Sequence, residues 1–196
     1  MSKRMFLAAA ALMVMTAPPA LAAGGEAVEA AAAALKPNRF VWNDPGTAEP
    51  VTVVVSIPQQ RAFLYRGDAL VAASSVSTGK DGKETPVGVY PILQKNLKHR
   101  SNLYDDAPMP FMQRLTWDGI ALHAGRNPGF PASHGCVRMP AEFARRLFDV
   151  TDLGTTVVVT EFDVYGDKLD RELLVTDEAR ANAEHLAMTA AMKGTD

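Results

Sequence analysis

The chain has 196 residues, with 20 lysines and arginines against 22 aspartates and glutamates, so its formal net charge is −2 at pH 7. This mild acidity gives no reason to expect nucleic acid as a partner, because binding to phosphates draws on an excess of basic side chains. The length suits one domain with one hydrophobic core.

The first 22 residues have the pattern of a secretory signal peptide. Lys3 and Arg4 precede an apolar run from Met5 to Met15, and small residues follow it up to Ala22. The run is shorter than the ~20 apolar residues of a transmembrane helix. A buried N-terminal helix is the alternative interpretation. We expect cleavage near Ala22 and a soluble, exported chain with no transmembrane segment after cleavage.

Residues 23–49 are interpreted as a lead-in or linker before the main domain. An alanine-rich stretch at 24–35 fits a short helix or a linker, and three prolines interrupt the segment from 36 to 50. We place the domain boundary near Pro50, where the pattern becomes that of β-strands.

Runs of β-branched and aromatic residues predict the strands that follow. The stretches at 51–55, 61–65 and 69–77 are separated by tight turns, which favours an antiparallel meander. Further strands are expected at 89–94, on both sides of the Asp118-Gly119 turn signal, and at 155–162. A long loop is expected at 95–113, where aromatic and methionine side chains fit either ordinary packing or the wall of a groove.

The last part of the chain is expected to be helical in two places. Pro140 is well placed to begin a short helix just after the cysteine, and the composition of residues 163–196 predicts a helical tail. The fold class is therefore mostly β, in an α+β arrangement with one short helix next to the cysteine.

Cys136 is the only cysteine of the chain, so it has no partner for a disulfide within the chain. In an oxidising compartment a lone thiol is better explained by reactivity than by packing. A thiol attacks as the thiolate and needs a base or a positive charge nearby. His123 and His134 are the candidate bases, and Arg138 is the candidate positive charge. Backbone N–H groups around Gly135 and Cys136 can face a developing oxyanion.

The same residues also have structural explanations. His134 and Cys136 lack the usual spacing of metal ligands, and no further cysteine exists, so no metal is expected. His123 taken alone fits a hydrogen-bonded histidine at the end of a strand.

The segment from His123 to Pro140, HAGRNPGFPASHGCVRMP, resembles the signature of the L,D-transpeptidase catalytic domain, the YkuD family. That signature has an upstream histidine, a loop, and then Ser/Thr-His-Gly-Cys followed by an arginine or asparagine. An earlier stretch, STGKDGKETPVG, is similar to the family's STGK…TPxG segment. The resemblance implies an L,D-transpeptidase-like β-sandwich or barrel, with the catalytic domain at 50–162.

The resemblance also implies a role for each matching residue. Cys136 matches the nucleophile, His123 matches the base that takes the thiol proton, and the carbonyl of Ala124 matches the group that orients the imidazole. Arg138 matches the position that faces substrate. Supporting roles, among them the oxyanion site, fall to Ser133, His134 and Gly135.

The implied activity is that of a periplasmic, cysteine-dependent acyltransferase that uses no cofactor. Its substrates are peptidoglycan stem peptides, cut between a diamino acid and D-alanine, and the acyl group passes to an amine. The amine belongs to a second stem, an envelope protein or a D-amino acid. The alternative on the same fold is a hydrolase, either an L,D-carboxypeptidase or an enzyme that detaches proteins from the wall.

Two further classes are disfavoured by the residues present. A non-catalytic wall-binding module predicts the loss of Cys136 or His123, and both are there. A papain-type protease has its cysteine at the start of a long helix, whereas helix breakers precede Cys136.

Overall fold

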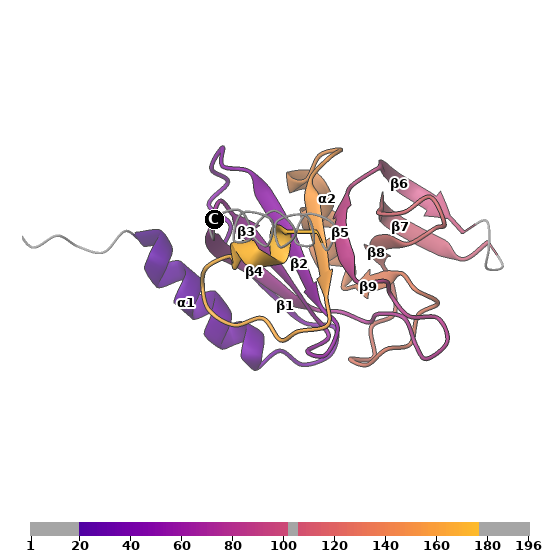
Figure 1. Ribbon diagram of the computed structural model, residues 1–196, viewed down its shortest axis with the longest axis horizontal. Helices are drawn as coiled ribbons and strands as arrows, with labels where there is room; N and C mark the ends of the chain where they lie inside the picture. The colour runs from indigo at the N-terminus through magenta and orange to yellow at the C-terminus, as the bar shows by residue number, and fades with distance from the viewer. Residues whose placement is uncertain (1–19, 102–105, 177–196) are drawn as a thin grey trace, which may run out of the picture.

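The computed structural model describes residues 20–101 and 106–176, and it shows two β-sheets with helices packed around them (Figure 1). The signal peptide expected at 1–22 and the helical tail expected at 163–196 lie mostly outside the described residues. Of the tail, the structure describes a short 3-10 helix, η1, at Arg171–Leu174. No helix within the described ranges is both long and apolar enough to cross a membrane.

The first sheet has six strands in the order β1-β4-β3-β2-β10-β5. β2, β3 and β4 form the antiparallel meander that the tight turns predict. β10 returns to pair with β2 in parallel, with Val158 opposite Val54, so distant parts of the chain meet at the centre of the sheet. The strands are β1 Phe40–Trp42, β2 Val51–Ser56, β3 Arg61–Arg66, β4 Ala69–Ser75, β5 Gly88–Pro91 and β10 Thr156–Thr160.

Both faces of this sheet are covered, which explains the uninterrupted apolar runs of its central strands. On the inner face, Val53 and Leu64 belong to the main core, which the sheet shares with the second sheet. On the outer face, Val54 and Tyr65 belong to a separate outer core. Helix α1, Ala20–Ala33, covers that outer face (Figure 1).

The segment at 23–49 is therefore part of the fold rather than a linker, and of the two interpretations of its alanine-rich stretch the short helix is the one that the structure shows. α1 places Val28 and Ala32 in the outer core, where they are 1% and 3% exposed. β1 pairs with β4 at one edge of the sheet, with Val41 opposite Ala73. The sequence allows the short helix but does not indicate its packing, because an alanine-rich helix has a weak apolar face. It does not indicate β1, because a three-residue strand has no measurable periodicity.

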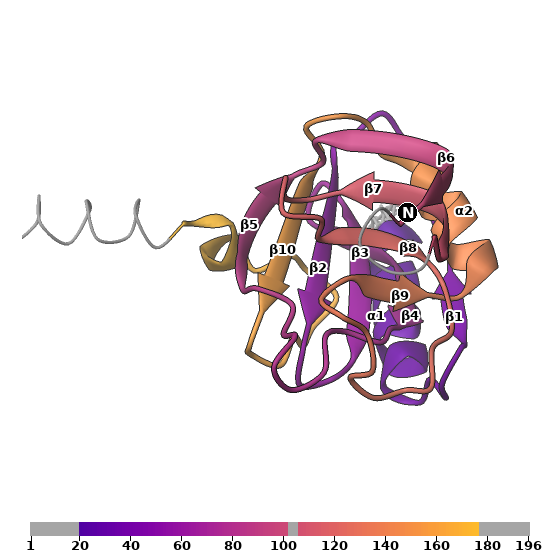
Figure 2. The same cartoon turned by 90° about the vertical axis from the view of Figure 1, so that its right-hand side faces the viewer.

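The second sheet has four strands in the order β6-β7-β8-β9, and they cross the strands of the first sheet (Figure 2). These strands are β6 Gln94–Arg100, β7 Pro108–Arg114, β8 Ala121–Ala124 and β9 Val137–Met139. β6, β7 and β8 pair in antiparallel fashion, whereas β8 and β9 are parallel. A parallel pair needs a crossover connection, and here it is the loop at 125–136, which ends at the cysteine.

The prediction of a long loop at 95–113 is also wrong, because most of that segment forms the β6–β7 hairpin. β6 is an edge strand whose charged side chains are largely exposed, a common way for edge strands to avoid pairing with other chains, and it therefore lacks an apolar alternation. Pro108 and Pro110 also argue against a strand. They lie where β7 pairs with β6 alone, and such one-sided pairing tolerates proline.

Helix α2, Ala141–Val150, follows β9 after Pro140, as predicted, and buries Phe143 and Leu147 in the main core. From β6, the ammonium of Lys95 donates hydrogen bonds to the carbonyls of Phe148 and Thr151, at 2.6 and 2.5 Å. A cation at this end of a helix is favourable because the helix dipole is negative there. These two hydrogen bonds of Lys95 therefore connect the second sheet to α2, the helix that follows the cysteine.

Candidate active site

Strands β8 and β9 place the candidate residues through the alternation of their side chains. His123 lies opposite Arg138 in the register of the two parallel strands. Their neighbours Leu122 and Val137 point into the main core. His123 and Arg138 therefore point to the other face of the sheet, and Cys136, one residue before β9, falls on the same face as Arg138.

These side chains open onto a cavity of about 410 Å³. The β6–β7 hairpin, the β7–β8 turn, β8 and the crossover loop all contribute to its wall. Five of the predicted site residues line it: His123, Ser133, His134, Cys136 and Arg138. The other two do not: Gly135 is buried in the loop, and the methyl group of Ala124 lies in the main core.

His123 is held in one orientation by the backbone. Its Nδ1 lies 2.8 Å from the carbonyl oxygen of Ala124, which only accepts hydrogen bonds, so Nδ1 carries the proton and Nε2 is left with a free lone pair. The side chain is 7% exposed, and burial lowers the pKa of His123 to about 4. The imidazole is therefore neutral at neutral pH and able to accept a proton at Nε2.

Cys136 is largely enclosed, and its thiol is weakly hydrogen-bonded. Sγ lies 3.4 Å from the carbonyl oxygen of Gly119 in the β7–β8 turn. The side chain packs against a small apolar cluster of Met109, Met112 and Ala121. Burial raises the pKa of the Cys136 thiol, which outweighs the opposing effect of a backbone N–H and nearby arginines. The resting site is thus a neutral thiol and a neutral imidazole that line the same cavity.

The turn before Cys136 is stabilised by the hydroxyl of Ser133. This hydroxyl accepts a hydrogen bond from the N–H of Gly135 at 3.0 Å and donates one to the carbonyl of Cys136 at 2.6 Å. Gly135 has φ +114°, and a Cβ there would lie 2.7 Å from Cδ1 of Ile120, so the position requires glycine.

This arrangement changes the expectation for the oxyanion site. The N–H groups around Gly135 and Cys136 are predicted to face an oxyanion, but that of Gly135 donates its hydrogen bond to the hydroxyl of Ser133. The N–H of Cys136 makes no hydrogen bond to another residue in the described part of the chain. It is therefore the donor that remains available at the nucleophile itself.

Positive charge gathers on one side of the cavity. Arg138 is half-buried, and its Nη2 donates to the carbonyl of Ala132 at 3.0 Å. Burial and the nearby charge of Arg126 both lower the pKa of Arg138. Arg126 also lines the cavity but is exposed, as is His134. The two guanidinium groups suit a ligand that carries carboxylates.

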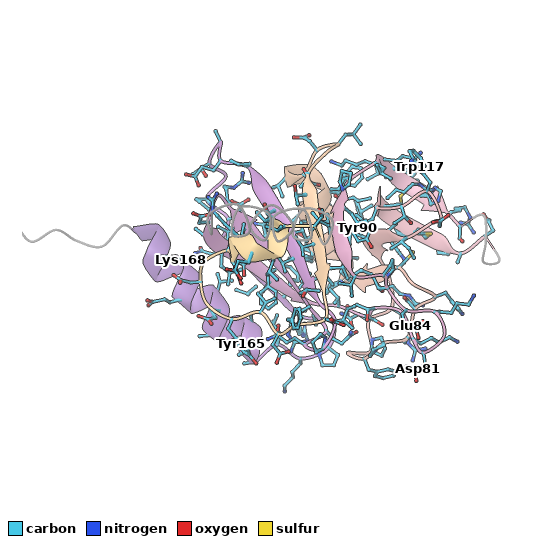
Figure 3. All side chains as sticks on the ribbon, in the orientation of Figure 1. Asp81, Glu84, Tyr90, Trp117, Tyr165 and Lys168 are labelled. Carbon is cyan, nitrogen blue, oxygen red and sulfur yellow. The ribbon has the colours of Figure 1, made fainter. Side chains whose placement is uncertain are left out.

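A second cavity of about 330 Å³ adjoins the first, and Met109, Asp118 and Gly119 line both. Its other walls include Trp117, which Figure 3 shows at the outer end of the second sheet and which is 74% exposed. Met109 thus packs in the small apolar cluster and also forms part of the wall of both cavities. Phe111, in contrast, packs against Phe148, with the ring centroids 6.1 Å apart.

Sequence reasoning missed the contribution of the β7–β8 turn. Asp118 and Gly119 were identified only as a turn signal, and the turn is there, with the N–H of Gly119 bonded to the carbonyl of Thr116. That the turn lies against the thiol follows from the pairing of β8 with β9, which no local pattern indicates. Within residues 20–101 and 106–176, no group of three or more His, Cys, Asp or Glu side chains is arranged to hold a metal ion.

A thiol and a histidine with a free Nε2, both lining one cavity, are the side chains of the type of site that performs acyl transfer. Residues 50–159 match the family model of the YkuD L,D-transpeptidase catalytic domain. This match covers more than half of the 196 residues, and the chain belongs to that family. A comparison with curated proteins found no match to the chain.

Solved structures of L,D-transpeptidases have the same fold. The enzyme from Stackebrandtia nassauensis is 26% identical, with a TM-score of 0.53, over 62% of this chain and 59% of that one. An L,D-transpeptidase from Mycobacterium tuberculosis H37Rv is 23% identical, with a TM-score of 0.52, over 57% of each chain. LD transpeptidase LdtMt1, in complex with imipenem, is 21% identical, with a TM-score of 0.53, over 57% of this chain and 59% of that one. The match therefore spans less than two thirds of each of these relatives.

Proposed function

We propose that the protein is an exported peptidoglycan L,D-transpeptidase with Cys136 as the nucleophile and His123 as its base. The observation that carries this proposal is the shared cavity, which both side chains line from neighbouring parallel strands. Membership of the family supports the reaction class. A solved relative in complex with imipenem supports a site that accepts an activated carbonyl.

In the first step, Sγ of Cys136 attacks the carbonyl carbon between the diamino acid and the terminal D-alanine of a stem peptide. The thiol proton passes to Nε2 of His123 and from there to the nitrogen of D-alanine, which leaves as the C–N bond breaks. The carbonyl oxygen becomes negative in the tetrahedral intermediate and is stabilised by the N–H of Cys136. The products are a thioester on Cys136 and free D-alanine.

The protonation states of the resting site support general-base catalysis rather than a preformed ion pair. The pKa of His123 is lowered to about 4 and that of Cys136 is raised, so a thiolate–imidazolium pair is unfavourable in the free protein. The proton moves when the substrate carbonyl is attacked. A protonated thiol also resists oxidation, which suits an oxidising compartment.

In the second step, an amine attacks the thioester, gives its proton to His123, and forms a new amide as the thiol is released. The second cavity offers room for this acceptor next to the first, and the two share the turn residue Gly119, whose carbonyl contacts the thiol. Arg138 and Arg126 suit the carboxylates of a stem peptide. The amine is that of a second stem, of an envelope protein or of a D-amino acid.

The compartment follows from the substrate and from the N-terminal sequence. Peptidoglycan lies outside the cytoplasmic membrane, so an enzyme that acts on it is exported. The signal-peptide pattern at 1–22 supports export to the periplasm. The alternative function on the same site is hydrolysis, in which water replaces the amine in the second step.

The direct test is mass spectrometry of the protein incubated with tetrapeptide muropeptides, with and without an added D-amino acid. Cross-linked or exchanged products that disappear in Cys136→Ala support transfer through a thioester. Tripeptide products alone, with every acceptor tried, favour the hydrolase. An imipenem adduct that persists in Cys136→Ala contradicts the assignment of the nucleophile.

A further inference from the structure

Thr85 contacts the cysteine loop from a part of the chain that no site assignment includes. It lies in the loop between β4 and β5 and is 2% exposed. Its hydroxyl accepts a hydrogen bond from the N–H of Gly79 at 2.9 Å and donates one to the carbonyl of Gly135 at 2.8 Å. Both hydrogen-bonding functions of this buried hydroxyl are therefore used.

The second of these contacts acts on the peptide unit that joins Gly135 to Cys136. In a trans peptide unit the C=O and the N–H are coplanar and point in opposite directions. The hydrogen bond from Thr85 fixes the direction of the C=O of Gly135, and so it fixes the direction of the N–H of Cys136. It also withdraws electron density from the carbonyl, which makes the N–H on the other side of the unit a stronger donor.

The peptide units on both sides of this one are fixed from elsewhere. Ser133 accepts from the N–H of Gly135 and donates to the carbonyl of Cys136, so it holds the preceding and the following unit. Thr85 is the described residue that holds the unit between them. Without its hydroxyl, a glycine at one end leaves this unit free to rotate.

The loop that carries Thr85 is tightly folded, and further hydrogen bonds attach it to the cysteine loop. A Cβ on Gly79 would lie 2.0 Å from the carbonyl oxygen of Lys83, so the chain folds back on itself at a distance that only glycine allows. The N–H groups of Ala132 and Ser133 both bond to the carbonyl of Thr78, each at 3.0 Å. These backbone bonds hold the two loops together whether or not residue 85 has a hydroxyl.

We propose that Thr85 is a positioning residue of the acyl-transfer reaction, which orients the N–H of Cys136 as the oxyanion donor through the carbonyl of Gly135. The inference rests on the proposed function, in which a tetrahedral intermediate forms at Cys136. It assigns to Thr85 an effect on carbonyl attack and no effect on the acidity or accessibility of the thiol.

The effect on carbonyl attack can be measured apart from any effect on the thiol, because the same thiol can be tested in two reactions. Alkylation by iodoacetamide needs a thiolate but forms no oxyanion, whereas acylation by imipenem forms one. Both rates are measured by mass spectrometry on the wild-type chain and on Thr85→Val, which keeps the shape and removes the hydroxyl. We expect acylation of Thr85→Val to fall about 10- to 100-fold, short of the ~10²–10³-fold loss when an oxyanion donor is removed outright. Alkylation is expected to remain within about 2-fold.

Two further variants keep the test decisive. Thr85→Ser retains the hydroxyl and should restore acylation to within about 3-fold of wild type. Thr78→Val removes another buried hydroxyl, one that bonds to Gln60 and not to Gly135, and should leave acylation close to wild type. Thermal melting of each variant tests whether the fold is retained.

Several outcomes overturn the inference. These are equal loss of acylation and alkylation in Thr85→Val, unchanged acylation in Thr85→Val, no recovery in Thr85→Ser, or an equal loss in Thr78→Val. Failure of the wild-type chain to form any acyl adduct, with imipenem or with a tetrapeptide stem, refutes the proposed function itself and is distinct from all four.

Discussion

Replacing His123 by glutamine should remove a specific component of the acid sensitivity of the fold. Burial lowers the pKa of His123 from an ordinary value of 6.5 to about 4 in the folded chain. Between these two values the unfolded chain binds more protons than the folded chain, so the free energy of unfolding decreases as the pH falls from 6.5 towards 4. Above this window the histidine is neutral in both states, and below it the histidine is charged in both, so it adds no further pH dependence.

The size of the effect follows from the width of the window. Each pKa unit corresponds to about 1.36 kcal/mol, so titration from pH 7 to about pH 4.5 removes roughly 2.5 kcal/mol from the wild-type chain through this one group. Urea denaturation at the two pH values measures the free energy of unfolding of wild type and of His123→Gln. The wild type should lose roughly 2.5 kcal/mol more than the variant, whatever the offset between them at pH 7. Equal losses would show that His123 is not buried as a neutral group.

The same titration sets the pH dependence of the reaction, and a buried ion pair provides a further test of the fold. The rate of imipenem acylation, as kcat/KM, should rise through about pH 4 and be level by pH 6, since His123 must be neutral to act as the proposed base; an inflection near 6.5 contradicts the buried imidazole. Asp44 binds Arg66 at 2.6 Å with both side chains at most 8% exposed. Asp44→Ala should therefore destabilise the chain by about 3–5 kcal/mol in urea, because it leaves a buried guanidinium unpaired. Glu142→Ala, which removes the exposed partner of Arg145 and Arg146 on α2, is the matched control and should shift the urea midpoint far less; an equally small shift for Asp44→Ala would contradict the reasoning.

Local sequence patterns predicted the strands that are buried along most of their length, and the turns and helices that depend on one or two neighbouring residues. β2, β3 and β10 are buried on both faces, so their apolar runs predict strands without ambiguity. The turn at Asp118-Gly119 predicts the β7–β8 hairpin because its backbone needs a residue that adopts positive φ, and Gly119 has φ +106°. The short helix after Pro140 is confirmed, and its signal is also local, because a proline is well placed to begin a helix.

The elements that were missed depend on contacts between distant segments. β1 was not predicted, and the packing of the alanine-rich helix α1, which the sequence left open as a helix or a linker, depends on the outer face of the first sheet. The parallel pairing of β8 with β9 is likewise set by tertiary packing, and it brings His123 and Cys136 to one face. The residue types at the site were predicted from the motif. The partners of those residues, such as the carbonyl of Gly119 and the hydroxyl of Thr85, come from elsewhere in the chain and have no spacing that identifies them.

Because α1 covers the outer face of the first sheet, the chain cannot be truncated beyond this helix without exposing that face. A fragment trimmed to residues 50–159, the segment that defines the family, keeps every residue of the proposed chemistry but leaves Val54 and Tyr65 without the helix that shields them. An apolar β surface of this kind promotes aggregation, so such a fragment is a poor choice for producing the enzyme. Removal of the signal peptide, which the proposed export requires, meets the same limit. A peptidase that acts near Ala22 spares Val28 and Ala32, whereas one that acts a dozen residues later removes them and uncovers the sheet.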